Sequence, residues 1–591
     1  MNREALFWPI LVTSLIALLG GMLLSEDRVG YQARVVPLVL IGTSTIWVLI
    51  LLLKRDISSR WIAKFQISLL LFSLTLYLLL VNRWVSIVGD NIGYIGAAQG
   101  LIAGKGLYNM ASPVPVPDLQ YGFGLPVMLV PLIYFFDSVV AMKLVPVFCA
   151  ALASAAIFLM MRKYAEGKYA AVISFLCAVN PLVWDYAHQI MTETPFLFFS
   201  ATALFLVVKY GEQPKVGGKY LYLAAVSLGW LYHVKGLGIL LLIASGAYLF
   251  LRREWKRAVL LVGVAGATIV PWMIRNAMLN PHPAGGIPYL SNFLVQMQME
   301  DASKSLLANI LNRFLSNLDV QFGATAEMIF PISFYGRKWV VPALVLIGYL
   351  HRLFRNQASA VKRFEGKTPS RSPRSKSPIR RSLRLGARLD LIEIYFALVF
   401  GAILIWPGAP SRYLIYVMPF LFFYFITGCV VVAGFVVEKL ERQPSLGLVR
   451  SVVFVAVVLV VSIPDLWADM EKIEFQRWQN GYGGPWTNYY KTAMWLKANT
   501  PPDATVVARK PGLIYMWSGR RGSVYPYTSD AQEMMAFFEK YDYVIADGFW
   551  EVGVFRETPR YLIPVIQEHS DRFEVAYKTD PPRNWVLRLK K

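Results

Sequence analysis

The chain contains a succession of apolar runs, separated by short segments that carry charges, glycines or prolines. A membrane-spanning helix needs about 20 mainly apolar residues. Thirteen runs approach that length, and they lie at residues 7–24, 35–53, 66–88, 138–161, 169–186, 192–209, 219–234, 236–251, 258–275, 337–351, 390–407, 412–437 and 449–464. Only 16% of the 591 residues are charged and the mean hydropathy is +0.47, a balance that a soluble domain cannot carry. We therefore predict a polytopic α-helical membrane protein with about 13 transmembrane helices.

The positive charges predict how these helices cross the membrane. With an internal N-terminus and thirteen spans, the internal loops and the adjoining parts of the spans carry 30 Lys and Arg residues, against 12 on the external side before the C-terminal region. A further apolar run at 124–136 is short and contains prolines, so we interpret it as a helix at the membrane interface. If it crossed the bilayer, the twelve positive residues of 352–388 would lie outside, against the positive-inside rule. Asp90 and the C-terminal region are therefore predicted to be extracytoplasmic.

The net charge of +22 does not indicate a nucleic-acid partner, because it is concentrated in internal loops. Segment 352–388 is rich in Ser, Pro and Arg, and we expect it to be disordered beside anionic membrane lipids. The three cysteines lie in apolar runs and predict neither a disulfide framework nor a zinc site. The first apolar run has no convincing cleavage site and predicts a retained helix.

Two domains are predicted from the change of composition near residue 465. Residues 1–464 form the membrane domain, with large external loops at 89–137 and 276–336. Within the second loop, residues 303–319 show a helical stripe of leucines that suits the membrane surface or packing on the C-terminal domain. Residues 465–591 predict a small α/β domain, with helices at 488–498, 529–540 and 558–569, strands at 504–508 and 542–546, and two terminal strands.

Ionisable residues at the edge of a bilayer are candidates for function, because they are costly to keep there. On the predicted external side these are Asp90, Lys105, Asp185, His188, Glu193, His233, Lys235, Arg275 and Arg412. Any one of them could be a snorkelling side chain. Carboxylates gathered with cations would suit glycosyl transfer from a lipid phosphate, since a carboxylate can act as general base and cations can hold the leaving phosphate.

Five motifs in this order resemble the GT-C superfamily of membrane glycosyltransferases. They are Asp90 with Tyr94 and the Gly-Lys-Gly-Leu-Tyr run at 104–108; the Tyr-Gly-Phe-Gly-Leu-Pro segment at 121–126; the acidic motif at 188–195 with Glu193; Pro271-Trp272 with Arg275-Asn276; and Ser411-Arg412-Tyr413. The resemblance is to bacterial relatives of protein O-mannosyltransferases and lipid A aminoarabinose transferases. Two positions depart from those relatives: Asn91 follows Asp90 where Glu is usual, and Gln120-Tyr121-Gly122 stands where Lys-Pro-Pro is usual.

The resemblance implies an inverting glycosyltransferase (hexosyl or pentosyl) of the bacterial inner membrane. Its donor would be a polyprenyl phosphate sugar and its acceptor an extracytoplasmic lipid, glycan or protein hydroxyl. Asp90 would be the base, Glu193 would orient the acceptor or share that role, and Arg412 and Lys235 would bind the phosphate. Further substrate-binding candidates are Tyr94, Lys105, Tyr108, Tyr121, His188, His233, Arg275 and Tyr413.

The sequence leaves alternatives open for both the cofactor and the function. No cofactor is certain, although His188 and His233 could join Glu193 on a divalent metal ion. A polysaccharide ligase or polymerase with a lipid diphosphate donor is the nearest alternative enzyme. A lipid or sugar transporter would show internal symmetry and paired broken helices, and a non-catalytic scaffold would not need acids and bases on one face.

Overall fold

A computed structural model describes residues 59–87, 89–114, 116–118, 121–213, 216–279, 293–294, 305–365, 389–406, 411–439, 446–478, 481–553 and 557–590. The chain divides into two compact units. We call residues up to 81 and 143–477 the helical unit, and residues 82–142 and 478–591 the sheet unit. The predicted spans 7–24 and 35–53 and segment 366–388 lie outside the described residues.

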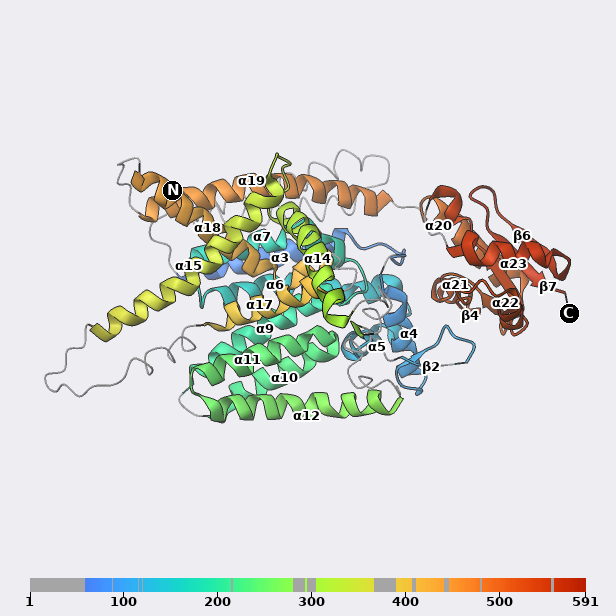
Figure 1. Cartoon of the computed structure of the whole chain (residues 1–591), viewed down its shortest axis with the longest axis horizontal. Helices are drawn as coiled ribbons and strands as arrows, with labels where there is room; N and C mark the ends of the chain where they lie inside the picture. Colours follow the sequence, from blue (N-terminus) through green and yellow to red (C-terminus); the bar gives the residue numbers. More distant parts are fainter. Residues whose placement is uncertain are drawn as a thin grey trace. The chain divides into compact units, whose positions relative to one another are not determined.

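The helical unit consists of helices, among which α9, α10, α11 and α12 pack side by side (Figure 1). The bounds are α3 Ser59–Leu79, α6 Val139–Met161, α7 Gly167–Ala178, α8 Pro181–Ala187, α9 Glu193–Gly211, α10 Lys219–Val234, η2 Gly236–Gly238, α11 Ile239–Leu251, α12 Trp255–Leu279, α14 Leu306–Ile329, α15 Arg337–Glu365, α17 Leu391–Ile405, η4 Ser411–Tyr416, α18 Met418–Lys439 and α19 Leu446–Trp478.

Six of the described helices are long and apolar enough to cross a membrane, or seven if the bent pair α7 and α8 forms one span. Three shorter apolar helices, Gly124–Phe136, Gly236–Leu251 and Leu391–Ile405, add to these. This confirms the prediction of a multi-span α-helical membrane protein, and the total of thirteen spans stays a prediction.

Two predicted spans differ in detail from the observed helices. The run 169–186 is bent by 57° between α7 and α8, because Asn180 caps α8 by accepting the N–H of Leu182, and Pro181 cannot continue α7. The run 66–88 is a helix only as far as Leu79. Residues 80–87 leave the helix, and there the Asn82 side chain accepts the N–H of Trp84.

Helix α15 continues to Glu365, into the segment where we expected disorder from residue 352. It packs along α18, where two glycines permit close approach. A Cβ on Gly348 would meet the Tyr424 carbonyl, and one on Gly428 would meet the Leu344 carbonyl. The two backbones are therefore in contact, a mode typical of membrane helices.

The predicted leucine stripe lies on helix α14, which packs on α15 and α17. Its leucines Leu307, Leu311 and Leu315 are exposed, whereas Asn309 and Asn317 are buried. The Asn317 amide donates to the carbonyls of Leu404 and Trp406, which explains why the polar face points inward. The exposed leucines fit the predicted membrane surface, and within the helical unit the opposite face of the helix packs on α15 and α17.

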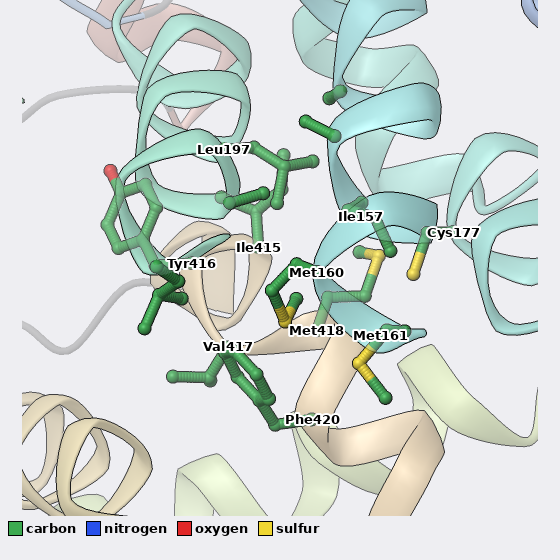
Figure 2. Packing of buried hydrophobic residues seen from close by; sticks show 14 of the residues in the cluster. Ile157, Met160, Met161, Cys177, Leu197, Ile415, Tyr416, Val417, Met418 and Phe420 are labelled. Carbon is green, nitrogen blue, oxygen red and sulfur yellow. The ribbon is translucent and has the colours of Figure 1, made fainter. Parts of the chain in front are cut away.

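The core of the helical unit is apolar and continuous from α3 to α19. Figure 2 shows part of it, where Ile415, Met418 and Phe420 pack near Leu197 and Met160. Because η4 is anchored by these side chains, the residues that it carries are held in fixed positions against α9.

The sheet unit is built on a five-stranded sheet in the order β4-β3-β5-β7-β6. Its strands are β3 Thr505–Val507, β4 Arg521–Ser523, β5 Tyr543–Ala546, β6 Phe573–Lys578 and β7 Trp585–Leu589. Strands β4, β3 and β5 are parallel, and β7 is antiparallel to β5 and β6. Its other elements are α20 Pro485–Asn499, α21 Pro511–Ser518, α22 Ala531–Phe538, η5 Phe549–Val552, η6 Thr558–Leu562, α23 Ile563–Glu568 and η7 Ser570–Arg572. The predicted α/β character is confirmed, while α21 and β4 were missed because both are short.

Residues 82–142 pack on this sheet as part of the same unit. They form α4 Asn91–Ile102, a hairpin of β1 Tyr108–Asn109 and β2 Val116–Pro117, and α5 Gly124–Phe136, the short helix predicted at 124–136. The N–H of Gly522 in β4 donates to the Ala111 carbonyl at 2.7 Å. Helix α21 lies against α4, where a Cβ on Gly512 would meet Ile92 at 2.9 Å.

Candidate active site

In the helical unit, a buried ion pair joins Glu193 to Lys235. Glu193 is the first residue of α9, where the positive end of the helix dipole favours a carboxylate, and it is 0% exposed. Lys235 follows the last residue of α10 with an extended backbone and is 5% exposed. Its Nζ lies 3.2 Å from Glu193 Oε1. Since a buried charge is costly without its partner, each residue fixes the other in place.

The short helix η4 adds two residues to this pair. The Tyr416 hydroxyl accepts from Lys235 Nζ at 2.5 Å and donates to Glu193 Oε1 at 3.3 Å. Arg412 Nε lies 3.6 Å from the same carboxylate oxygen, and the Arg412 side chain is 22% exposed. The two cations outnumber the one carboxylate, so the cluster keeps an excess positive charge.

Two aromatic rings of η4 complete the surroundings of Lys235. The rings of Tyr413 and Tyr416 stack at 5.7 Å, and the Lys235 Nζ lies 4.8 Å and 5.0 Å from their centroids. The Arg412 guanidinium is 5.4 Å from the Tyr413 ring. Ring faces attract a cation without neutralising it, so both charges stay available to an anion. We refer to Glu193, Lys235, Arg412, Tyr413 and Tyr416 as the cation cluster.

The remaining candidates of the helical unit are held elsewhere by backbone or neighbouring groups. His188 is buried and its Nδ1 lies 3.0 Å from the Trp184 carbonyl. His233 Nε2 lies 3.0 Å from the Thr268 carbonyl. Arg275 Nη1 donates to the Asn276 side chain at 2.8 Å, and its guanidinium lies over Trp272. Asp185, at the end of α8, pairs with Lys472 at 2.7 Å.

The hypothesis of a metal site on His188, His233 and Glu193 is not supported by this geometry. Within the described ranges, no group of three or more His, Cys, Asp or Glu residues is placed to hold a metal ion. Glu193 instead directs one oxygen to Lys235, and each histidine uses one ring nitrogen on a carbonyl group.

In the sheet unit, Asp90 immediately precedes α4, and it is only partly buried. Its Oδ1 accepts the hydroxyl of Tyr121 at 3.2 Å, and the Tyr121 and Tyr94 rings pack at 4.5 Å. Gly93 makes this arrangement possible, because a Cβ there would overlap the Tyr121 ring. The structure thus brings together three of the predicted residues around one carboxylate.

A lysine that the sequence did not single out interacts with Asp90. Burial and the neighbouring Arg509 lower the pKa of Lys510, and the charge of Asp90 opposes that lowering. Lys510 precedes α21, and its backbone N–H donates to the Tyr489 hydroxyl at 3.0 Å. A cavity of about 320 Å³ lies beside Tyr121 and Gly93, between α4, β2 and α21.

Lys105 and Tyr108 do not converge on Asp90 as closely. Lys105 is exposed in the turn after α4, and its N–H donates to the Gly100 carbonyl. Tyr108 lies in β1, opposite Pro117 of β2. The glycines of this run serve the turn, because Gly104 and Gly106 have φ values of 69° and 81°, in the left-handed region.

Tyr416 and Lys510 are the functional candidates that sequence reasoning missed. Tyr416 follows Tyr413 by three residues, and three residues complete one turn of a 3₁₀-helix, so the two rings share a face. That spacing was visible in the sequence. Lys510 carried no such signal, because its neighbour Asp90 is distant in the chain.

Comparison with known proteins found one matching family model and several similar solved structures. A family model described as dolichyl-phosphate-mannose-protein mannosyltransferase matches residues 129–274. By sequence, no curated protein matches the chain.

Two solved proteins have a similar structure. The archaeal oligosaccharyltransferase AglB from Archaeoglobus fulgidus, in complex with an inhibitory peptide and a dolichol-phosphate, is 13% identical with a TM-score of 0.50. That match covers 90% of this chain and 75% of AglB. ArnT from Cupriavidus metallidurans, bound to undecaprenyl phosphate, is 12% identical with a TM-score of 0.53. It is matched over 90% of this chain and 98% of ArnT. At these identities the likeness establishes the fold.

Proposed function

We propose that the chain is a member of the GT-C superfamily and that it transfers a sugar from a polyprenyl phosphate carrier to an extracytoplasmic acceptor. The acceptor is a hydroxyl of a lipid, a glycan or a protein, and the sugar is a hexose or a pentose. The two similar structures were solved with a dolichol-phosphate and with undecaprenyl phosphate, which supports a polyprenyl phosphate as the carrier.

The cation cluster is the observation that carries this proposal. Lys235 and Arg412 converge on one buried carboxylate, and the aromatic rings hold both cations without cancelling their charge. A phosphate that loses its sugar gains negative charge, which nearby cations stabilise more strongly than they stabilise the bound donor. Arg412, the more exposed of the two, would contact the phosphate through its planar fork, with Lys235 behind it.

Asp90 is our proposed general base. The acceptor oxygen attacks the anomeric carbon and gives its proton to the Asp90 carboxylate as the bond from that carbon to the phosphate oxygen breaks. The products are the glycosylated acceptor and the polyprenyl phosphate, with inversion at the anomeric carbon. Tyr121 would hold the carboxylate in position, and Tyr94 would support Tyr121 by ring packing.

The test is binding of undecaprenyl phosphate to purified full-length protein in one detergent, because this probe requires no knowledge of the sugar. We expect Arg412→Lys to lose about 1–3 kcal/mol of binding free energy, the scale of a charge-assisted hydrogen bond. Arg275→Lys is the matched control, since Arg275 belongs to the same unit but lies on α12 beside Trp272. Absence of binding by the wild type, or equal affinity of wild type and Arg412→Lys, would contradict the proposal.

A further inference from the structure

A second site of the helical unit lies away from the cation cluster. It is a cavity of about 1000 Å³ between the end of α6, the starts of α7 and α19, and the middle parts of α15 and α18. Its lining contains the basic residues Arg162, Lys163, Arg352 and Arg450 beside His351, and Glu166 is the single acid in that lining. The lining also contains the apolar residues Phe423, Ile426, Val430, Val431 and Phe454. We call it the basic cavity.

The basic cavity lies at the far end of α9 from Glu193. Helix α9 begins at Glu193 and ends at Gly211. The next residue, Glu212, forms a 2.8 Å ion pair with Lys163 of the cavity. A helix of this length spans about 28 Å at 1.5 Å per residue, close to the hydrocarbon thickness of a bilayer. The basic cavity and the cation cluster are therefore expected at opposite membrane surfaces, and the charge pattern predicts the cytoplasmic one for the cavity.

Behind Arg352 lies a group of buried polar atoms that lack hydrogen-bond partners. Arg352 Nε contacts Glu393 Oε1 at 3.2 Å, and Glu393 is 0% exposed. Among the described residues, Glu393 Oε2 and the hydroxyls of Tyr164 and Tyr424 have no partner. Tyr164 lines the cavity, its ring is 5.8 Å from the Arg352 guanidinium, and Tyr424 belongs to the same electrostatic cluster. Of these groups Tyr164 lines the cavity, so a ligand bound there would supply the hydrogen bond that its hydroxyl lacks.

The charges around the cavity match a ligand with one negative charge. Arg450 pairs with Glu166 through Nη1 at 3.2 Å, Lys163 pairs with Glu212, and Arg352 pairs with Glu393. Arg162 has its guanidinium 5.6 Å from the Phe158 ring. These are four cations and three carboxylates; Lys209, which also pairs with Glu212, and Asp390, whose charge acts on Glu393, add one charge of each sign, so one positive charge is left. Each guanidinium has five N–H donors, so donors remain for an anion after these ion pairs form.

We propose that the basic cavity binds an anionic phospholipid with a phosphodiester headgroup. The phosphate would accept from Arg352, Arg450, Arg162 and the Tyr164 hydroxyl. Acyl chains would follow the apolar lining residues of α18, which continues into exposed Phe435 and Val436. Basic pockets between membrane helices on the cytoplasmic side are a known mode of anionic lipid recognition.

The test measures lipid retention by purified full-length protein with native mass spectrometry. We expect the wild type to retain phosphatidylglycerol in preference to phosphatidylcholine. The double variant Arg162→Gln/Arg450→Gln should retain phosphatidylglycerol about tenfold more weakly, because two phosphate contacts are lost. The matched control is Arg253→Gln/Lys256→Gln, two exposed cations just before and in the first turn of α12, predicted at the same membrane surface.

A second variant separates lipid binding from folding. Tyr164→Phe removes one hydroxyl that has no partner in the described structure, so the lipid-free protein should unfold at an unchanged or higher temperature. The same variant should bind phosphatidylglycerol several-fold more weakly. Equal retention by wild type, Tyr164→Phe and the double variant would overturn the proposal. Displacement of the lipid by an equal concentration of soluble glycerol 3-phosphate would assign the cavity to a soluble phosphate and overturn it as well.

Discussion

The two candidate carboxylates differ in how tightly their surroundings hold them. Glu193 is completely buried, and one of its oxygens is shared by Lys235, Tyr416 and Arg412. Asp90 is partly exposed at the start of a helix and accepts the Tyr121 hydroxyl at 3.2 Å. Protonation of Glu193 would leave the Lys235 ammonium buried without a counter-charge, whereas Asp90 is accessible to a substrate. The comparison supports our proposal that Asp90 accepts the proton, and it favours a positioning role for Glu193.

The largest effect is expected from Asp90→Asn, which keeps the shape of the side chain and removes the proton acceptor. Turnover should fall by about 10²–10⁴-fold, the usual contribution of a general base. Affinity for undecaprenyl phosphate should stay unchanged, since a carboxylate does not attract a phosphate. The measurement is the single-turnover rate of the variant and of the wild type with the same polyprenyl phosphate sugar. A full rate in this variant would move the role of base to Glu193 and reverse the comparison.

Glu193→Gln should act mainly on stability. It leaves Lys235 charged and buried, which costs about 3–5 kcal/mol when one member of a buried ion pair is removed. We expect a marked fall in the thermal unfolding temperature in detergent, and recovery in the double variant Glu193→Gln/Lys235→Met, which removes both charges. If Glu193→Gln were as stable as the wild type but inactive, Glu193 would be a catalytic residue rather than a positioning one.

The smallest effect is expected from Tyr416→Phe, which keeps the stacked ring and removes the hydroxyl between Lys235 and Glu193. Loss of a hydrogen bond to charged groups should cost about 1.5–3 kcal/mol in unfolding free energy. Tyr413→Phe is the control, because the Tyr413 ring stacks on Tyr416 and approaches Lys235 through its face. Chemical denaturation of both variants gives the comparison. Equal losses would show that the Tyr416 hydroxyl does not hold the ion pair together.

Much of the fold follows from local patterns in the sequence. The apolar runs at 138–161, 192–209 and 258–275 match α6, α9 and α12 closely, because hydrophobicity over about 20 residues determines which segments can cross a membrane. The short helix at 124–136 and the two terminal strands were predicted from the same kind of signal. The sequence also contained a signal for the break at Asn180-Pro181, because a capping residue followed by proline separates two helices. The apolar run around it had favoured a single span.

The candidate residues came from the sequence, and their groupings came from the tertiary structure. Glu193, Lys235 and Arg412 were selected because placing a charged side chain at the edge of a bilayer costs free energy, which indicates a function. Three observations depended on contacts across the fold: Tyr416 joins these residues, Lys510 interacts with Asp90, and His188 and His233 each lie against a backbone carbonyl. The pair of Arg352 and Glu393 was equally hidden, because the two residues lie in helices separated by the basic segment. Sequence periodicity reports the environment of one element at a time, and only packing determines which side chains from distant elements share a buried charge.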